Sequence, residues 1–433
     1  MAEILIASLS PLGHINPLLA IAQDLVARGD RVTVMTGAAH TEAIQATGAR
    51  PHPLPAIADF DASPFDSSAR GRTSRLKALN LALIRLFLNP MPHQAAEMSM
   101  ATARGHFDAI IVDYGFFGVV PLLLGDPADR PPVVYFTPTP LMLSSRDTAP
   151  TGMGLPPGTG TVGRLRNRAL NLLSQKVILR EAHRTTNAML ATLGVRELPV
   201  FLLDVGVLAD RFIVPTVPSF EYPCSDLAAN VRFVGAVHPP SSRCYVPPHW
   251  WADLDGDRPV VHVTQGTVDN ADLSRLIEPA IEALSDEDVT VVVTTGGRDV
   301  RDISVPLPSN TRVAEYIPHD VLLPKVDVMV TNGGYGAVQR AVSTGVPLIV
   351  AGSTEDKPEV AARVAWSGAG INLKTGTPTP TMIRGAVREI LDDGRFLRHA
   401  RELEAAFAQR DGIAETAALV DEVIRERRPK ASR

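Results

Sequence analysis

The sequence contains few cysteines, few aromatic residues and little net charge. Only two of its 433 residues are cysteines, Cys224 and Cys244, and neither stands in the paired Cys/His spacing of a zinc site. We therefore expect no disulfide framework, and a reducing cytoplasm suits such a chain. The formal net charge of −5 argues against a surface that binds polyanions, so nucleic acid is not expected as a partner.

Long apolar runs and metal-binding motifs are also missing. No uninterrupted apolar stretch reaches membrane-spanning length, and the first residues enter a strand-like run without the basic region of a signal peptide. We expect a soluble, unprocessed chain; its oligomeric state cannot be predicted. The one metal-like string, Asp253–Asp257, lacks the spacing of the glycine and of the distal glutamate that a calcium loop has, so no metal is expected.

What the chain does contain is a strand–helix alternation that occurs twice. Residues 4–7, 15–26 and 31–35 predict a strand, a helix and a second strand, which is the start of a parallel α/β sheet. The alternation restarts at Val260, after a stretch rich in proline, serine and aspartate. The length also exceeds that of one ordinary core. We predict domains at residues 1–238 and 259–405, a linker at 239–258 and a helical C-terminal segment at 406–433.

Further strands and helices follow from apolar runs and helical periodicity. Residues 165–193 and 380–427 are expected to be helical, and the Gly/Pro/Thr-rich stretch 148–163 predicts a mobile surface loop. The other predicted strands are residues 109–112, 132–136, 212–214, 231–234, 260–263, 289–294, 326–331 and 348–351.

His14 is the first candidate for chemistry. It follows the first strand, next to Gly13, where a parallel strand gives way to a helix. A neutral imidazole can take a proton from a hydroxyl group, and a carboxylate improves such a base by fixing its tautomer. Asp113, at the end of another predicted strand, is the natural partner. The alternatives are a capping or core histidine and an aspartate that caps the next helix.

Two glycine-rich turns in the second half indicate a phosphate site. One is Asn332-Gly333-Gly334-Tyr335-Gly336, and the other is Gly266-Thr267; each follows a predicted strand. Glycines let backbone N–H groups approach an anion, and the start of a helix adds positive potential. A single turn of this kind is often only a tight strand–helix connection, but two in one domain favour a nucleotide site.

At these residues the sequence resembles the UDP-glycosyltransferase superfamily, the family-1 glycosyltransferases of the GT-B fold, and especially bacterial enzymes that glycosylate macrolides and other natural products. The resemblance covers nearly the whole chain. It is most specific at residues 316–319, 330–334, 345–347 and 355–362. It implies two Rossmann-like, doubly wound parallel-sheet domains that face each other across a cleft, with a C-terminal helix that returns to the N-terminal domain.

The resemblance also implies a role for each matching residue. His14 would be the base that deprotonates an acceptor hydroxyl, and Asp113 the carboxylate that orients it. Tyr316 would stack on the nucleobase in place of the usual tryptophan, and Asp356 would contact hydroxyls of the donor sugar. The full set that it assigns to the nucleotide sugar is Gly13, Gly266, Thr267, Tyr316, Ile317, His319, Asn332, Gly333, Gly334, Tyr335, Gly336, Glu355, Asp356 and Lys357.

Four residues depart from the family pattern. Asn332 replaces a common histidine at the phosphate turn, and Lys357 and His319 each replace a glutamine. Arg340 stands where many members place a glutamate on the ribose hydroxyls. These changes leave the sugar and the nucleotide open, with UDP placed ahead of TDP only because it is common in the family.

The implied reaction is an inverting, metal-independent hexosyl transfer to a small lipophilic acceptor. A sugar-nucleotide 2-epimerase and a catalytically silent NDP-sugar-binding helper protein remain as alternatives. The acceptor pocket is expected in loops of the first half, including residues 60–75, 82–91 and 138–143. Its candidate residues are Asn16, Phe87, Tyr114, Phe116 and Leu141.

Overall fold

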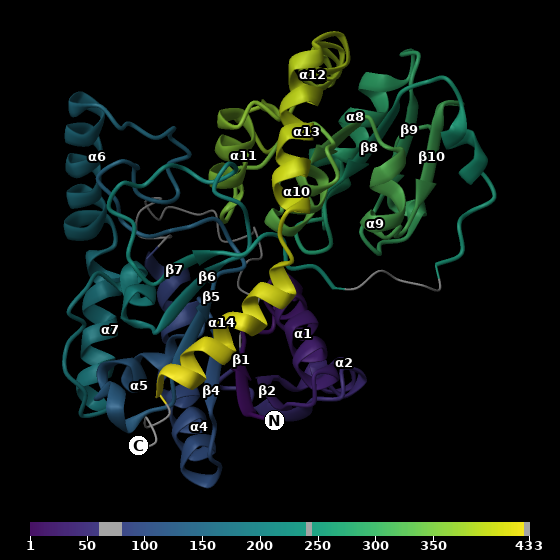
Figure 1. Cartoon of the computed structure of the whole chain (residues 1–433). Helices are drawn as coiled ribbons and strands as arrows, with labels where there is room; N and C mark the ends of the chain where they lie inside the picture. Colours follow the sequence, from purple (N-terminus) through teal and green to yellow (C-terminus); the bar gives the residue numbers. More distant parts are fainter. Residues whose placement is uncertain (60–79, 240–244, 428–433) are drawn as a thin grey trace.

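A computed structural model describes residues 1–59, 80–239 and 245–427, and it shows two α/β domains joined side by side (Figure 1). The N-terminal sheet has the strand order β3-β2-β1-β4-β5-β6-β7 and the C-terminal sheet β10-β9-β8-β11-β12-β13. Neighbouring strands in both sheets pair in parallel, for example Ile4 with Val32 and Val263 with Val330. The predicted fold of two doubly wound, Rossmann-like domains is therefore confirmed.

The N-terminal sheet is buried on both faces because helices cover each side. In β1, Leu5 and Ala7 pack in one core and Ile4 and Ile6 in the other, which explains why this strand is a continuous apolar run. The elements of this domain are β1 (Glu3–Ala7), α1 (Leu12–Ala27), β2 (Arg31–Gly37), α2 (Thr41–Ala46), β3 (Arg50–Leu54), α4 (Met91–Arg104), β4 (Ala109–Asp113), α5 (Val120–Leu124), β5 (Val133–Phe136), α6 (Thr161–Leu173), α7 (Arg180–Thr192), β6 (Arg211–Val214) and β7 (Val231–Phe233).

The C-terminal domain has the same build. Its β8 and β11 are fully buried, and its cores lie on the two sides of the sheet. Its elements are β8 (Val260–Thr264), α8 (Ile277–Leu284), β9 (Thr290–Thr294), β10 (Thr311–Ala314), α9 (His319–Leu322), β11 (Val328–Thr331), α10 (Tyr335–Ser343), β12 (Leu348–Val350), α11 (Lys357–Trp366), β13 (Gly370–Asn372), α12 (Pro380–Asp392) and α13 (Gly394–Ala408).

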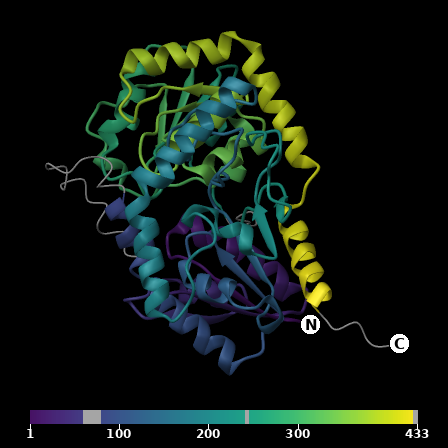
Figure 2. The same ribbon diagram turned by 90° about the vertical axis from the view of Figure 1, so that its left-hand side faces the viewer.

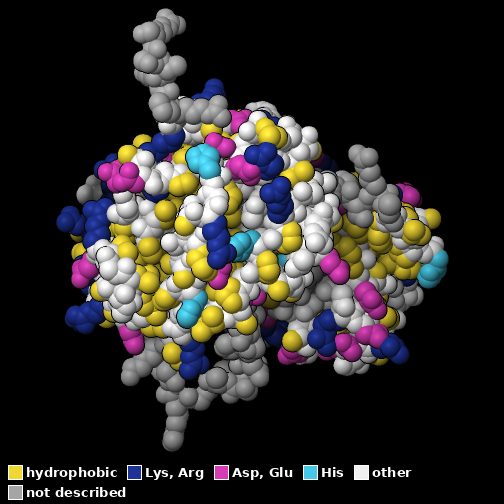
Figure 3. Space-filling model, turned by 90° about the horizontal axis from the view of Figure 1, so that it is seen from below, with side chains coloured by type: hydrophobic (Ala, Val, Ile, Leu, Met, Phe, Trp, Pro, Cys, Tyr) yellow, Lys and Arg dark blue, Asp and Glu magenta, His cyan; other side chains and the backbone are white. Residues whose placement is uncertain are grey.

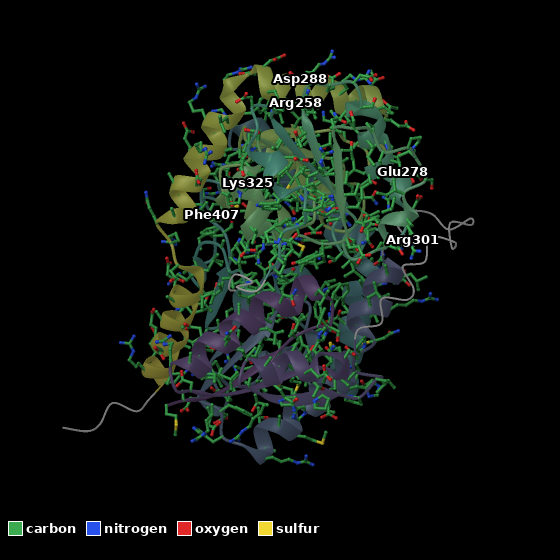
Figure 4. All side chains as sticks on the ribbon, turned by 90° about the vertical axis from the view of Figure 1, so that its right-hand side faces the viewer. Arg258, Glu278, Asp288, Arg301, Lys325 and Phe407 are labelled. Carbon is green, nitrogen blue, oxygen red and sulfur yellow. The ribbon has the colours of Figure 1, made fainter. Side chains whose placement is uncertain are left out.

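The end of the chain crosses back to the N-terminal domain. Helix α13 packs against α10, and Phe407, labelled in Figure 4, is buried near its end. The chain then turns, and α14 (Gly412–Arg427) lies against α1 of the other domain (Figure 1). The helical region predicted over residues 380–427 is thus three helices, of which the last one changes domain.

Two further segments differ in detail from the prediction. The helical stretch predicted over residues 165–193 is divided into α6 and α7 by a π-helical turn, Ser174–Ile178. The loop before α6 carries no strand or helix, yet it is anchored, because the N–H groups of Gly152 and Gly154 donate to Glu359 on α11 at 2.9 and 2.7 Å. In the linker, Asp253 pairs with Arg312 of the C-terminal domain at 2.6 Å.

Candidate functional site

The first-half candidates His14 and Asp113 are in direct contact. His14 lies in the first turn of α1, and its Nδ1 is 2.8 and 3.0 Å from the two carboxylate oxygens of Asp113 at the end of β4. Strands β1 and β4 are neighbours, so both side chains reach the carboxyl edge of the sheet. The imidazole is 21 % exposed while Asp113 is fully buried. Nε2 makes no hydrogen bond to another described residue, so it is the nitrogen that can receive a proton.

The Asp113 carboxylate is held in place from two further directions. The N–H of Leu9 donates to its Oδ2 at 3.1 Å, and the N–H of Gly115 donates to its Oδ1 at 3.3 Å. Because Asp113 accepts hydrogen bonds only, His14 Nδ1 must carry the hydrogen between them, which leaves Nε2 as a lone-pair acceptor. This is the tautomer that a general base requires.

The charge on Asp113 also controls the titration of His14. Partial burial lowers the pKa of the imidazole, but the charge and the hydrogen bond of Asp113 outweigh this effect and raise the pKa above 6.5. Asp356 and Glu355 raise it further, although both belong to the C-terminal domain. His14 is therefore within electrostatic reach of the residues assigned to the donor sugar.

Asn332 connects the two glycine-rich turns of the C-terminal domain. Its side-chain Nδ2 donates to the backbone oxygen of Gln265, and its Oδ1 accepts from the N–H of Gly334 at 3.4 Å. The side chain that replaces the family histidine thus braces the turn after β8 against the turn after β11.

The glycines of these turns have two different roles. Gly333 has φ +87°, and a Cβ there would lie 2.6 Å from Val350, so the turn itself requires a glycine at this position. A Cβ on Gly336 or Gly13 would meet nothing within 4 Å, and one on Gly334 or Gly266 would meet only Asn332, at 4.0 and 3.7 Å. These four glycines therefore border open space rather than packed neighbours.

The start of α10 points its first N–H groups into this space. No hydrogen bond joins the N–H of Tyr335 or of Gly336 to another described residue, as expected for the first turn of a helix. Unpaired amides and the helix dipole make this a suitable place for an anion. The Tyr335 side chain is only 4 % exposed and packs in the core, so only its backbone lies at the turn.

The residues predicted around the nucleobase are divided between surface and core. Tyr316 is 60 % exposed and available for stacking, whereas Ile317 is buried and could offer only its backbone. The His319 ring lies 5.6 Å from that of His262. Burial, together with the charge on Arg340, lowers the pKa of His319 to about 3, so this ring is neutral inside the domain.

A charged cluster lies next to the phosphate turns. The ammonium group of Lys357 contacts Asp269 at 3.2 Å, Thr354 Oγ1 at 3.1 Å and the carboxylate of Glu355, and its side chain is only 4 % exposed. Asp269 also pairs with Arg275 at 2.8 Å. Lys357 is therefore already neutralised, and no local sequence pattern indicates Asp269, Thr354 and Arg275 as its neighbours.

Glu355 and Asp356 immediately precede α11, and Glu355 has an uncommon backbone conformation. Glu355 has φ +54°, a left-handed conformation that a side chain with a Cβ seldom adopts and that is often found at functional sites. Burial raises the pKa of Asp356 to about 6, with a further contribution from Glu355, while Lys357 and His14 act in the opposite direction. The carboxyl group assigned to the sugar hydroxyls thus titrates close to neutrality.

A buried ion-pair network joins the two domains beside this helix. Arg363 of α11 donates to Glu221 at 2.6 Å, to Glu359 at 3.0 Å and to the backbone oxygen of Leu141 at 3.2 Å. The N–H of Leu141 in turn donates to Glu221 at 3.1 Å. The loop that carries a predicted acceptor residue is therefore fastened to the helix that begins at the donor-sugar residues, a contact that no local sequence pattern indicates.

Most predicted acceptor residues are less accessible than expected. Phe116 is fully buried, and Tyr114 is 7 % exposed with its hydroxyl donating to Leu203 at 2.7 Å. Both side chains fill the core below β4, so in this structure they do not face an acceptor. Asn16 and Phe87 are half-buried, and Phe87 lies close to Gly115. Residues 60–75 and Cys244 lie outside the described residues.

Comparison with known proteins decides the family. The chain is 40 % identical to the 4'-demethylrebeccamycin synthase of Lentzea aerocolonigenes, over 98 % of this chain and all of that protein. It is 38 % identical to UDP-glycosyltransferase 2 of Phaeomoniella chlamydospora, over 97 % and 95 % of the two chains. The chain belongs to the family-1 glycosyltransferases. Residues 278–423 also match the C-terminal domain of erythromycin biosynthesis protein CIII-like proteins.

Solved structures of other glycosyltransferases share the fold. The glycosyltransferase of kitacinnamycin superimposes with a TM-score of 0.71 at 23 % identity, covering 98 % of both chains. CalG4, the calicheamicin glycosyltransferase, gives 0.70 at 20 % identity over 99 % of this chain and all of CalG4. At such identities these structures support the GT-B arrangement and not a particular substrate.

Basic and acidic side chains are interspersed on the face seen in Figure 3. Within the described ranges, no helix combines the length and the apolar character needed to cross a bilayer. Among the same residues, no three histidine, cysteine or acidic side chains converge as metal ligands would.

Proposed function

We propose that this glycosyltransferase moves a hexose from an NDP-sugar to a hydroxyl group of a small lipophilic natural product, with inversion at the anomeric carbon. The contact between His14 and Asp113, within electrostatic reach of Asp356, is the observation that carries the proposal. UDP is the first choice of nucleotide and TDP the second. A relative with this fold, VinC, is described in complex with dTDP, and another, SpnG, with spinosyn aglycone.

In the proposed reaction, Nε2 of His14 takes the proton of the acceptor hydroxyl. The acceptor oxygen forms a bond to the anomeric carbon from the face opposite the diphosphate, and the bond from that carbon to the diphosphate oxygen breaks. The leaving diphosphate keeps the electron pair. Asp113 stabilises the imidazolium that results, as a buried carboxylate does for other catalytic histidines.

The C-terminal domain would bind the departing group. The N–H groups at the start of α10 and the turn at Gly266 and Thr267 surround open space and can donate to phosphate oxygens. Tyr316 would stack on the base, and Asp356 would accept from sugar hydroxyls. Because backbone amides and the helix dipole supply the stabilisation of charge, the proposed step uses no metal ion.

Replacing the base tests the proposal. His14→Ala should lower kcat/KM for transfer by roughly 10²- to 10⁴-fold, the usual contribution of general-base catalysis, while calorimetry shows unchanged donor affinity. His93→Ala, on the exposed side of α4, is the matched control and should keep full activity. Undiminished transfer by the His14 variant would rule out the assigned base.

The two alternative functions would give different results in assays of the same protein. A sugar-nucleotide 2-epimerase would change the donor sugar when no acceptor is added, which nuclear magnetic resonance of the donor would reveal. A silent NDP-sugar-binding helper would bind the donor without turnover for any acceptor. The paired His14 and Asp113 favour the transferase over both.

A further inference from the structure

Helix α6 exposes apolar side chains and buries polar ones. The exposed side chains are Val162 (83 %), Leu165 (69 %), Leu172 (50 %), Leu173 (46 %) and Val177 (62 %), the last one in the π-helical turn after α6. Their spacing places them on one side of the helix. The side that faces the protein carries Asn167, Asn171 and Ser174 instead. The usual amphipathic pattern of a surface helix is therefore reversed.

Hydrogen bonds, and not apolar packing, hold the inner side of α6. The Asn167 amide donates to the backbone oxygens of Arg146 and Gly158 at 3.2 and 3.3 Å. The Asn171 amide donates to those of Ser145 and Thr148 at 3.1 Å each. None of the exposed apolar side chains belongs to one of the hydrophobic cores found among the described residues. Since the described part of the fold does not use this apolar face, the face is available to a partner.

The charges on α6 and on the π-helical turn after it are all positive, up to the exposed Glu181 of α7. From Thr161 to Arg180 the sequence contains no aspartate or glutamate. It contains five cations, namely Arg164, Arg166, Arg168, Lys176 and Arg180. Arg166 and Arg168 are exposed and lie on opposite flanks of the apolar face. Among the described residues, Arg164 alone of these five has an acidic partner, Asp147 at 2.7 Å.

This charge pattern selects the kind of partner. If two copies paired through the same face, cations would meet cations in either orientation, and like charges at such close range repel. A surface of anionic lipids would instead attract the cations while it accepts the apolar side chains between its headgroups. The combination is that of an interfacial helix, and the 13 residues of α6 are too few to span a bilayer.

The position of α6 would bring a bound membrane close to the loop expected to bind the acceptor. Helix α6 lies on the outer side of the molecule and crosses the view in Figure 2, where no other helix covers it. The loop from Leu141 to Gly160, which leads into α6, is the one that Arg363 and Glu359 fasten to the donor helix α11. An acceptor dissolved in a membrane would thus enter next to the loop expected to bind it.

We propose that the α6 surface, defined as the exposed side chains from Val162 to Val177, docks the protein on anionic bilayers. It binds peripherally, through apolar insertion between headgroups and attraction of the flanking cations. The docking concerns binding alone, so it stands whether or not His14 is the catalytic base.

Vesicle co-sedimentation tests the docking with the full-length chain. Vesicles of phosphatidylglycerol and phosphatidylcholine should bind the protein, and added salt should weaken this binding, whereas vesicles of phosphatidylcholine alone should bind it much more weakly. Leu165→Gln with Leu172→Gln should lower the partition coefficient roughly tenfold or more, because the variant loses the free energy gained when the two leucine side chains move from water into the bilayer. Each cation removed, as in Arg168→Gln, should lower it about fivefold.

Matched controls separate docking from general surface effects. Leu307→Gln with Leu397→Gln changes two leucines that are 52 % and 45 % exposed on the other domain, and this variant should bind vesicles as the unaltered protein does. All variants should keep their melting temperature and donor affinity. Equal vesicle binding by the Leu165/Leu172 variant would overturn the proposal. So would sedimentation velocity showing a dimer that this variant abolishes, because the partner would then be a second copy.

Discussion

Replacing Asp113 by asparagine should move the pH profile of transfer as well as its rate. In the native protein, burial lowers the pKa of His14, but the Asp113 charge outweighs this and keeps the pKa above 6.5. Opposite charges about 4 Å apart attract by about 4 kcal/mol at an effective dielectric constant of 20, which is enough to exceed the cost of partial burial. Asp113→Asn removes that attraction and leaves burial opposed only by the smaller contributions of Asp356 and Glu355. The pKa of His14 should then fall below 6.5.

Activity requires neutral His14, so kcat/KM of the native protein should rise with pH through an inflection above 6.5. In the variant the inflection should lie below 6.5. The plateau should nevertheless fall by roughly 10²- to 10⁴-fold, because an amide can donate to Nδ1 and favour the tautomer in which Nε2 already carries hydrogen. A profile of kcat/KM from about pH 5 to 9 measures both effects.

A second, partly buried carboxylate beside the same sheet supplies the control. Asp210 accepts from Arg130 at 2.6 Å and from the N–H of Val133 at 2.8 Å, and it lies before β6, away from His14. Asp210→Asn should lower stability without moving the inflection. If Asp113→Asn keeps the native inflection and plateau, the carboxylate does not govern His14 and the reasoning fails.

Three other perturbations test separate parts of the site. Gly336→Ala should stabilise α10 by roughly 0.5–1 kcal/mol in thermal unfolding, and it should weaken donor affinity in calorimetry because the new Cβ enters the open space at the phosphate turn. The control is Gly385→Ala in α12, where a Cβ also meets no neighbour; it should raise stability without lowering donor affinity. Arg363→Met should cost about 3–5 kcal/mol in denaturant unfolding by leaving Glu221 buried without its partner, a result that an unchanged midpoint would contradict. The pKa of Asp356 in the folded protein is raised to about 6, so ionisation of this carboxyl group destabilises the fold as pH rises from about 4 to 6. Asp356→Asn should therefore raise Tm more at pH 8 than at pH 4.5. An equal change in Tm at both pH values would refute the shift.

The sequence predicted the central strands and the edge strand β7 well, but it did not predict the edge strands β3, β10 and β13. β1, β4, β8 and β11 are buried on both faces, so they appear as continuous apolar runs. β3 lies at an edge of its sheet and contains two prolines in five residues, a composition that does not indicate a strand. Such a segment becomes a strand because β2 offers it hydrogen-bond partners, which no local pattern reveals.

In the candidate site, too, some contacts could be predicted from the sequence and others could not. His14 and Asp113 could be paired in advance, since the ends of neighbouring parallel strands meet at one edge of a sheet. The burial of Phe116 could not be read, because an aromatic residue beside a strand end gives no sign of which way its side chain points. The contact of Asp269 with Lys357 joins residues far apart in the chain and follows only from the folded domain.

The crossing of α14 limits how the two halves of the molecule can move. The polypeptide passes between the domains twice, once through the segment before β8 and again between α13 and α14. Two covalent tethers define a pivot line, so the domains can swing about that line but cannot slide apart or twist freely. A fragment that ends at Ala408 would have one tether only, and it would expose the apolar side of α1 on which Val420 and Ile424 now rest.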